Sequence, residues 1–375
     1  MTTVLAVAGI SARMLAEAAQ GDGFDVVALD LFGDADTRRA CSQWLPLGQP
    51  GDLRIDAAML LSALGGLAQR ADVSGWVAGS GFEGQPDLLA RGAALLPLIG
   101  TPADAVRRVR DPQVFFEFLD LQGIPHPPVR MSAPPDAAAW LVKDAGGCGG
   151  WHVRRATPSE TAPAHHYVQR EVPGTPMSAT FIANGSGACV LGFNQLIVRR
   201  FGTRPFVFCG AAGPVALSAE LTSAVTAAVR LLAAGFALRG LGSLDFMLDG
   251  NQFSVLEVNP RPPASMALYG PRRVFAAHLR ACLHAELPLD WAAPSSGSVH
   301  GTEIVFAQRP TSLDEPAARR LAELAGCHDL PFAAMRFDAA DPVCSVSAQG
   351  ESAHAVRSLL ERRREAVHQF LETLA

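Results

Sequence analysis

The first hundred residues alternate between apolar runs and a helical pattern. Residues 3–8 are an apolar run that ends at Gly9, a helical stretch continues to about Gln20, and residues 24–31 form a second apolar run. A strand, a helix and a strand in this order favour a parallel sheet, because the helix returns the chain to the end from which it started. Gly9-Ile-Ser-Ala-Arg13 lacks the G-x-G-x-x-G spacing, so we expect no dinucleotide site after the first strand.

Two alternating segments later in the chain predict a β-hairpin. Residues 244–248 and 253–258 are rich in β-forming residues, and the turn sequence Asp249-Gly250-Asn251 lies between them. Pairing of the two segments would place Asp245 opposite the end that carries Glu257 and Asn259.

The side chains at this end of the hairpin suit a metal ion. Glu257 and Asn259 are two residues apart on one strand and therefore leave the same face of it. Two carboxylates, with Asp245, and an amide oxygen are ligands for a hard cation such as Mg²⁺, with Mn²⁺ as an alternative. Arg261, two residues further on, could hold phosphoryl oxygens bidentately.

Further helices and strands are indicated by periodicity and by capping residues. The helices are expected at 114–122, stopped by Gly123 and Pro125, at 218–238 with Ser218 as the cap, and at 352–374. The strands are expected at 76–78, 139–143, 166–172, 302–307 and 344–350.

A chain of 375 residues is too long for one ordinary core. We expect an α/β domain at 1–100, a central domain at 101–290 and a small α+β domain at 295–375. The central domain is expected to divide into subdomains at about 101–175 and 176–290, and residues 292–297 have the composition of a linker.

Composition excludes several classes of protein. The net charge of −5 provides no basic surface for nucleic acid, and no lysine or arginine cluster is interleaved with aromatic residues. Seven scattered cysteines without a Cys-x-x-Cys motif indicate neither a disulfide framework nor a zinc site. The start lacks the features of a signal peptide and no run of 18 apolar residues occurs, so we expect a soluble cytoplasmic protein without a membrane partner.

The hairpin and the segments upstream of it resemble the ATP-grasp superfamily. Asp245…Glu257-Val-Asn259-Pro-Arg261 is similar to the metal-binding end of that family, and residues 114–128 match its "helix, then Gly-Ile-Pro-x-Pro" entry. Residues 12–38 resemble the opening domain of a branch of carboxylate–amine ligases associated with C1-carrier cofactors. The resemblance implies an ATP-grasp fold with an amino-terminal Rossmann-like domain before it.

The resemblance also implies a nucleotide clamp in the central domain. Lys143 ends a strand and precedes a loop with four glycines, so that its charge and the bare backbone N–H groups could hold the ATP phosphates. The segment 166–174 is similar to the family's hinge strand, which meets the adenine. The expected nucleotide-binding residues are Lys143, Gly146, Gly147, Gly149, Gly150, Gln169, Arg170, Glu171 and Val172, and the expected catalytic residues are Lys143 and Arg261.

Three positions depart from the family pattern. Pro112 stands where many relatives have a basic residue, with Arg107, Arg108 and Arg110 nearby. Pro176 replaces a ribose-binding glutamate for which Glu171 is a candidate substitute, and Ser243 replaces an arginine that several of the ligases carry.

The resemblance implies a ligase that forms an acyl phosphate and then an amide, with a small carboxylate and an amine as substrates. Glutamate ligation in the synthesis of a methanofuran- or methanopterin-type cofactor is one reading, and Arg199, Arg200 and Arg204 are candidates for binding a second carboxylate. A carboxylase-like enzyme, a dipeptide ligase and a nucleotide-binding regulatory protein remain alternatives. The sequence leaves the two substrates and the oligomeric state open, with a homodimer as one option.

Overall fold

The amino-terminal domain is a parallel sheet covered by helices. The computed structural model describes residues 3–270, 273–288, 291 and 298–374. Strands β1 (Val4–Ala8), β2 (Asp25–Asp30), β3 (Gln43–Pro46) and β4 (Val73–Ala78) form a sheet in the order β3-β2-β1-β4. All three pairings are parallel, which confirms the expectation from the strand–helix–strand pattern.

The loops that follow these parallel strands lie at one edge of the sheet. Since parallel strands run in one direction, their carboxyl ends meet at that edge, where α/β domains place their ligands. The helices of this domain are α1 (Arg13–Gly21), α2 (Ala35–Arg39), α3 (Ala57–Leu67) and α4 (Pro86–Leu95), with a 3₁₀ turn η1 (Pro50–Asp52), and helix α5 (Ala103–Arg110) follows.

The first part of the clamp is a helix followed by a small sheet. Helix α6 (Pro112–Gln122) begins where the Asp111 side chain accepts a hydrogen bond from Val114 N, and it ends at Gly123, whose φ of 64° is left-handed. Strands β5 (Val129–Arg130), β6 (Trp140–Asp144), β7 (Arg154–Arg155) and β8 (His166–Arg170) form a sheet in the order β5-β8-β6-β7.

One large antiparallel sheet joins the second part of the clamp to the carboxyl-terminal segment. Its order is β13-β12-β9-β10-β11-β14-β18-β16. The strands are β9 (Thr175–Asn184), β10 (Ala188–Phe201), β11 (Arg204–Val215), β12 (Arg239–Asp249), β13 (Gln252–Asn259), β14 (Val299–Phe306), β16 (Cys327–His328) and β18 (Pro342–Gly350).

The pairing of β11 with β14 carries this sheet across the expected boundary near residue 295. The carboxyl-terminal segment therefore shares its sheet with the clamp. The expected domain limits stay a prediction, and the proposed linker at 292–297 lies outside the described residues.

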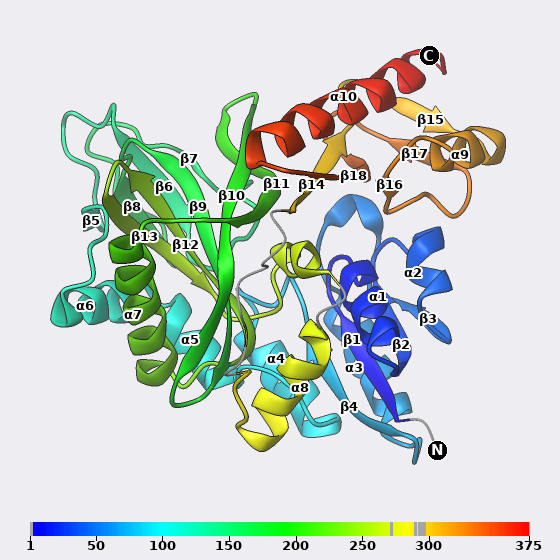
Figure 1. The fold of residues 1–375 in the computed structure, drawn as a ribbon, viewed down its shortest axis with the longest axis horizontal. Coiled ribbons are helices and arrows are strands. Elements are labelled where there is room, and N and C mark those ends of the chain that lie inside the picture. The colour runs from blue at the N-terminus through cyan, green and yellow to red at the C-terminus, as the bar shows by residue number, and fades with distance from the viewer. Residues whose placement is uncertain (1–2, 271–272, 289–290, 292–297, 375) are drawn as a thin grey trace.

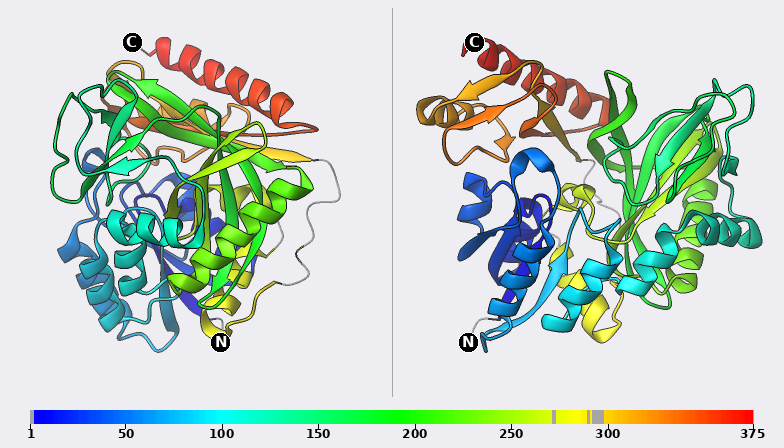
Figure 2. Two further views of the ribbon diagram at one scale, coloured as in Figure 1. Left: turned by 90° about the vertical axis from the view of Figure 1, so that its left-hand side faces the viewer. Right: turned by 180° about the vertical axis from the view of Figure 1, so that it is seen from behind.

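Helices cover the large sheet and complete the carboxyl-terminal segment. They are α7 (Ala219–Gly235), η2 (Ala264–Tyr269), α8 (Val274–His284), α9 (Glu315–Ala322) and α10 (Ala353–Glu372), and β15 (Thr311–Leu313) pairs with β17 (Met335–Phe337). Figure 1 shows α10 above the carboxyl-terminal strands, and the views of Figure 2 show the carboxyl-terminal segment above the amino-terminal domain. No helix in the described part of the chain is long and apolar enough to cross a membrane.

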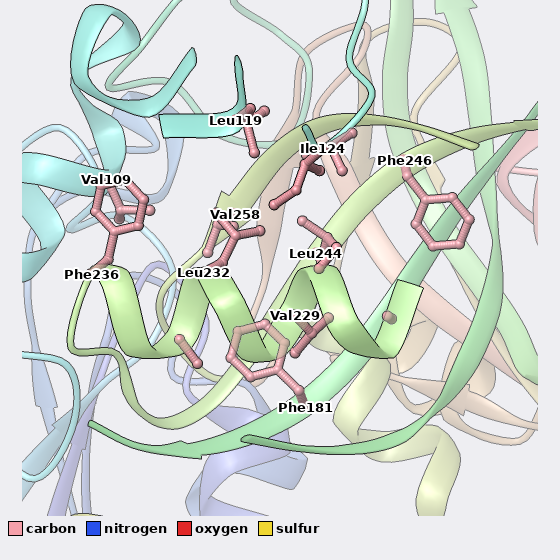
Figure 3. Packing of buried hydrophobic residues seen from close by; sticks show 14 of the residues in the cluster. Val109, Leu119, Ile124, Phe181, Val229, Leu232, Phe236, Leu244, Phe246 and Val258 are labelled. Atoms are coloured by element: carbon pink, nitrogen blue, oxygen red, sulfur yellow. The ribbon is translucent and has the colours of Figure 1, made fainter. Parts of the chain in front are cut away.

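The predicted capped helix packs on the strands that carry the hairpin. Ser218 caps α7 by accepting a hydrogen bond from Leu221 N, and one face of the helix, including Val229 and Leu232, is buried. Figure 3 shows these side chains against Leu244 and Val258 of the hairpin strands. Each fully buried leucine or valine contributes about 1.5–3 kcal/mol. The core beneath the hairpin thus positions its polar end.

Candidate active site

The hairpin forms as the alternation predicted. Asp245 pairs with Glu257, Ser243 pairs with Asn259, and Asp249 pairs with Gln252 across a turn in which Gly250 has a φ of 56°. The register shifts between Asp245 and Phe246, because Phe246 pairs with Val255.

Three oxygen-bearing side chains of the hairpin line one cleft, which has a volume of about 960 Å³. They are Asp245, Glu257 and Asn259. Asn259 Nδ2 donates to Asp245 Oδ2 at 3.0 Å, and Ser243 Oγ donates to Asp245 Oδ1 at 3.1 Å. Ser243 therefore orients the aspartate.

The two carboxylates of the hairpin differ in acidity. Burial and the nearby negative charge of Glu257 raise the pKa of Asp245 to about 7. Burial also disfavours ionised Glu257, but the charges of Arg110, Lys143 and His152 outweigh it and lower the pKa of Glu257. Two carboxylates that repel each other beside an amide oxygen fit a divalent cation, which would favour the ionised form of both.

The cleft brings together the residues that the resemblance assigned to the nucleotide. Lys143 and Gln169 are 8% and 2% exposed, and Lys143 Nζ donates to Gln169 Oε1 at 3.1 Å. Lys143 is also the only lysine in the sequence, a signal that the sequence alone could have supplied. The predicted nucleotide-binding residues that line the cleft are Lys143, Gly146, Gly147, Gly149, Gly150, Gln169, Arg170, Glu171 and Val172.

Two buried polar atoms in this part of the cleft have no hydrogen-bond partner within the described chain. They are Gln169 Nε2 and His152 Nδ1. Such atoms are rare in folded proteins unless a ligand or water satisfies them. Glu171, the candidate for ribose binding, forms an ion pair with Arg155.

Arg110 holds the glycine loop against the hairpin, although the sequence indicated it only as one of three arginines near Pro112. Its Nε donates to Ala145 O and its Nη2 to Gly147 O, both at 2.8 Å, while Nη1 lies 3.2 Å from Glu257 Oε2. The side chain is 7% exposed. Arg110 is the last residue of α5 and lies two residues before Pro112, the position at which a basic residue was expected. A search at that position alone therefore overlooks it.

The glycine loop needs glycine where it approaches β11. A Cβ on Gly150, whose φ is 77°, would lie 1.9 Å from Phe206 O, and Phe208 N donates to Gly149 O at 2.9 Å. The absence of side chains therefore permits the loop to lie directly on the strand.

Arg261 reaches the cleft together with a residue of the amino-terminal domain. Its Nε donates to Glu83 Oε1 at 2.8 Å, and Glu83 Oε2 accepts from Gly81 N at 2.7 Å. Burial disfavours ionised Glu83, but the charges of Arg261 and Arg110 outweigh it and lower the pKa of Glu83. The sequence signal for Glu83 was its position after a glycine-rich turn. Such a stretch is more often a plain turn.

The expected carboxylate-binding arginines lie elsewhere, and we correct that expectation. Arg199 Nε donates to Glu303 Oε1 at 2.8 Å, and Arg200 is exposed with its Nε bonded to Gly202 O. Alternation along β10 explains the position of Arg199, because its neighbour Val198 lines the cleft and Arg199 faces the other side, whereas Arg200 lies near the turn that ends β10 at Phe201. Arg199, Arg200 and Arg204 are not among the described residues that line the cleft.

Comparisons with known proteins agree with this geometry. The family model described as "ATP-grasp domain" matches residues 110–265. The L-amino acid ligase from Bacillus licheniformis is 14% identical, with 97% of each chain covered and a TM-score of 0.68. The N5-carboxyaminoimidazole synthase from Aspergillus clavatus, solved with ADP and 5-aminoimidazole ribonucleotide, is 13% identical, with 98% of this chain and 99% of that chain covered and a TM-score of 0.69.

A third similar structure was also solved with a nucleotide. The N5-carboxyaminoimidazole synthetase from Staphylococcus aureus complexed with ADP is 15% identical, with 97% of this chain and 98% of that chain covered and a TM-score of 0.66. The comparison with curated proteins finds no match. At these identities the structural likeness shows the fold, and the family model identifies residues 110–265 as an ATP-grasp domain within it.

Proposed function

We propose that this protein is an ATP-dependent ligase that joins a carboxylate to an amine through an acyl phosphate. The observation that carries the proposal is the convergence of Lys143, the glycine loop, the strand around Gln169 and the hairpin carboxylates on one cleft. These elements come from different parts of the clamp, and a phosphate-bearing nucleotide with a metal ion is the ligand that accounts for all of them together.

The nucleotide would lie along the inside of the clamp. The charge of Lys143 and the N–H groups of the loop 146–150 bind the α- and β-phosphates, and the unpartnered Gln169 Nε2 offers a hydrogen bond to the ligand. The hairpin end carries Asp245, Glu257 and Asn259, which would hold Mg²⁺, or Mn²⁺ in its place. When bound, such an ion neutralises charge on the phosphate oxygens.

The protein's own groups then orient the reactants. Arg261, fixed by Glu83, is placed to bind the transferred γ-phosphoryl group or the carboxylate that attacks it. An oxygen of the substrate carboxylate bonds to the γ-phosphorus as the bond to the ADP oxygen breaks. The amine nitrogen next bonds to the acyl carbon, phosphate leaves, and the nitrogen loses a proton, which gives an amide, ADP and phosphate.

No protein nucleophile is needed in this sequence. Cys148 lies in the glycine loop, but burial raises the pKa of its thiol to about 12, so it stays protonated near neutral pH. Its small side chain fits the tight loop.

The identity of the carboxylate is tested by ADP release. Glutamate is the first candidate, although the arginines once expected to bind its second carboxylate lie outside the cleft. We expect ADP release that depends on a carboxylate, and hydroxylamine in place of the amine should give a hydroxamate. ADP release that depends on bicarbonate and gives no hydroxamate with any amino acid would favour a carboxylase-like enzyme. Tight binding of Mg²⁺–ATP with no turnover on any acceptor would favour a regulatory protein.

A further inference from the structure

The cleft continues from the clamp into the junction between the amino-terminal domain and the carboxyl-terminal segment. Its lining there includes Arg13, Asp34, Asp329 and Ser345. The junction is held by backbone contacts, since Ala35 N donates to Leu330 O at 2.8 Å. The two segments therefore form one wall of the cleft, on the side where α2 lies beside the carboxyl-terminal segment in Figure 1.

The positive charge of this wall is already paired. Arg13 Nε donates to Asp329 Oδ1 at 2.6 Å, and its Nη1 donates to Glu17 Oε2 at 2.8 Å. Arg13 also lies 3.5 Å from Asp36 Oδ2, and Ser345 Oγ donates to Asp329. Three carboxylates share one guanidinium, so this part of the cleft has an excess of negative charge. Arg54 also lines the cleft and is exposed.

Two of the three aspartates between residues 30 and 36 have structural partners. Asp30 accepts hydrogen bonds from Ala12 N at 2.9 Å and from Trp44 Nε1 at 2.8 Å. Asp36 accepts from the backbone N–H groups of Asp329 and Leu330 at 2.7 and 3.1 Å. These carboxylates hold the loop and the junction in place.

Asp34 is different. It is 5% exposed, lines the cleft and precedes helix α2, yet its side chain does not cap that helix. Within the described residues its carboxylate accepts no hydrogen bond. Burial, followed by the charges of Asp329, Asp30 and Asp36, raises its pKa to about 9, and Arg13 offsets this only in part.

With a pKa of about 9 the Asp34 carboxyl group keeps its proton near neutral pH in the free protein, and its position on the cleft lining, without a donor from the described chain, leaves it available to a ligand. A bound ammonium or guanidinium group would favour the ionised form of Asp34 and supply N–H donors to it, whereas the surrounding carboxylates repel an anion and a neutral group brings no compensating charge.

We propose that Asp34 binds a cationic nitrogen group of the amine substrate at the junction of the amino-terminal domain and the carboxyl-terminal segment. The inference rests on the ligase function proposed above, and it adds the charge class of the second substrate. The group is either the reacting amine, bound as its ammonium ion, or a second ammonium or guanidinium group on the same molecule.

The first test needs no substrate. Asp34→Asn keeps the shape of the side chain and prevents its ionisation, while Asp25→Asn removes an exposed charge at the other end of β2. If Asp34 is a binding residue, thermal unfolding of the ligand-free Asp34→Asn variant should occur at the same temperature as the wild type or higher. A clear decrease, as expected for the structural Asp36→Asn, would overturn the proposal.

The second test uses small cations as probes. Wild type with Mg²⁺–ADP is heated with ethylamine, 1,4-diaminobutane or guanidinoethane, and with 1-butanol as an uncharged comparison. We expect the cations to raise the unfolding temperature of wild type and of Asp25→Asn but not of Asp34→Asn. A stronger effect of the diamine than of the monoamine would indicate a second cationic group. Equal shifts in wild type and Asp34→Asn, or no difference between the cations and the alcohol in wild type, would overturn the proposal.

The third test separates this inference from the proposed function. Trapping of the acyl phosphate by hydroxylamine does not need the amine substrate, so hydroxamate formation should proceed in Asp34→Asn much as in wild type. With an accepted amine, KM for that amine should rise at least about tenfold while KM for ATP is unchanged. Loss of hydroxamate in wild type would count against the ligase itself, whereas an unchanged amine KM in Asp34→Asn would count against the role of Asp34.

Discussion

Arg261 of the clamp is held by Glu83 of the amino-terminal domain, with 2.8 Å between Arg261 Nε and Glu83 Oε1. Glu83 is 3% exposed and is fixed in turn by the backbone of Gly81. The side chain that we propose to bind the transferred phosphoryl group is thus oriented by a residue far away in the sequence. The amino-terminal domain consequently contributes to the proposed active site.

Replacement of Glu83 should impair catalysis more than nucleotide binding. In Glu83→Gln the charge that orients Arg261 is lost, so we expect kcat for ADP release to fall about tenfold or more with little change in KM for ATP. Asp87→Asn is the control, because Asp87 is an exposed partner of Arg107 on the surface. Rates are compared at a temperature at which circular dichroism shows each variant folded. An unchanged kcat in Glu83→Gln would mean that Arg261 does not need this orientation.

Replacement of Glu257 should abolish ADP release. Glu257→Gln removes one of the two carboxylates expected to hold the metal ion, so Mg²⁺-dependent nucleotide binding should weaken as well. The control Glu286→Gln changes an exposed glutamate and should leave turnover intact. Turnover of Glu257→Gln near the wild-type rate would contradict the metal assignment.

Replacement of Lys143 tests the proposed nucleotide binding directly. A charge-assisted phosphate contact contributes roughly 1.5–3 kcal/mol, so Lys143→Met should weaken ATP binding about tenfold or more in calorimetry. Because the sequence contains no other lysine, the only amines that an amine-reactive reagent can modify are those of Lys143 and the amino terminus. ATP should protect Lys143 from modification and leave the amino terminus reactive. Equal reactivity at Lys143 with and without ATP would place it outside the site.

Arg110 should contribute to both stability and nucleotide binding. In Arg110→Met the partly buried Glu257 loses its closest cation and two loop carbonyls lose their donor, so we expect a loss of about 3–5 kcal/mol in the free energy of unfolding. The control Arg107→Met lies on the same helix, where Arg107 is 48% exposed and pairs with surface aspartates. Denaturant titrations measure the free energy of unfolding of both variants. Similar losses of unfolding free energy in Arg110→Met and Arg107→Met would contradict the role assigned to Arg110.

The core beneath the hairpin provides a matched pair of leucines. Leu232 is 1% exposed and Leu231, its neighbour on α7, is 40% exposed. We expect Leu232→Ala to lower the free energy of unfolding by about 2–5 kcal/mol. Leu231→Ala should change it by no more than about 0.5 kcal/mol. If the two variants lose equal stability in denaturant titrations, the packing of α7 on the sheet is assigned incorrectly.

Local sequence determined the parts of the site that lie close together along the chain. The hairpin follows from a turn at Asp249-Gly250-Asn251 between two alternating strands, so the approach of Asp245 to Glu257 could be predicted. The caps at Asp111 and Ser218 and the left-handed Gly123 set helix limits in the same way. Such signals are readable because turns and caps depend on residues a few positions apart.

The tertiary structure alone decided which charges are paired. Arg199 looked free in the sequence, but β14 brings Glu303 to it, and the same sheet carries the carboxyl-terminal segment onto the clamp. Arg110 reaches the site from helix α5, and Glu83 reaches it from a glycine-rich loop. Asp34 has no hydrogen-bond donor within the described residues, whereas Asp30 and Asp36 do. Hydrogen bonds and ion pairs act over a few ångströms in space, whatever the separation in sequence, and so these pairings depended on the packing of three distant segments around one cleft.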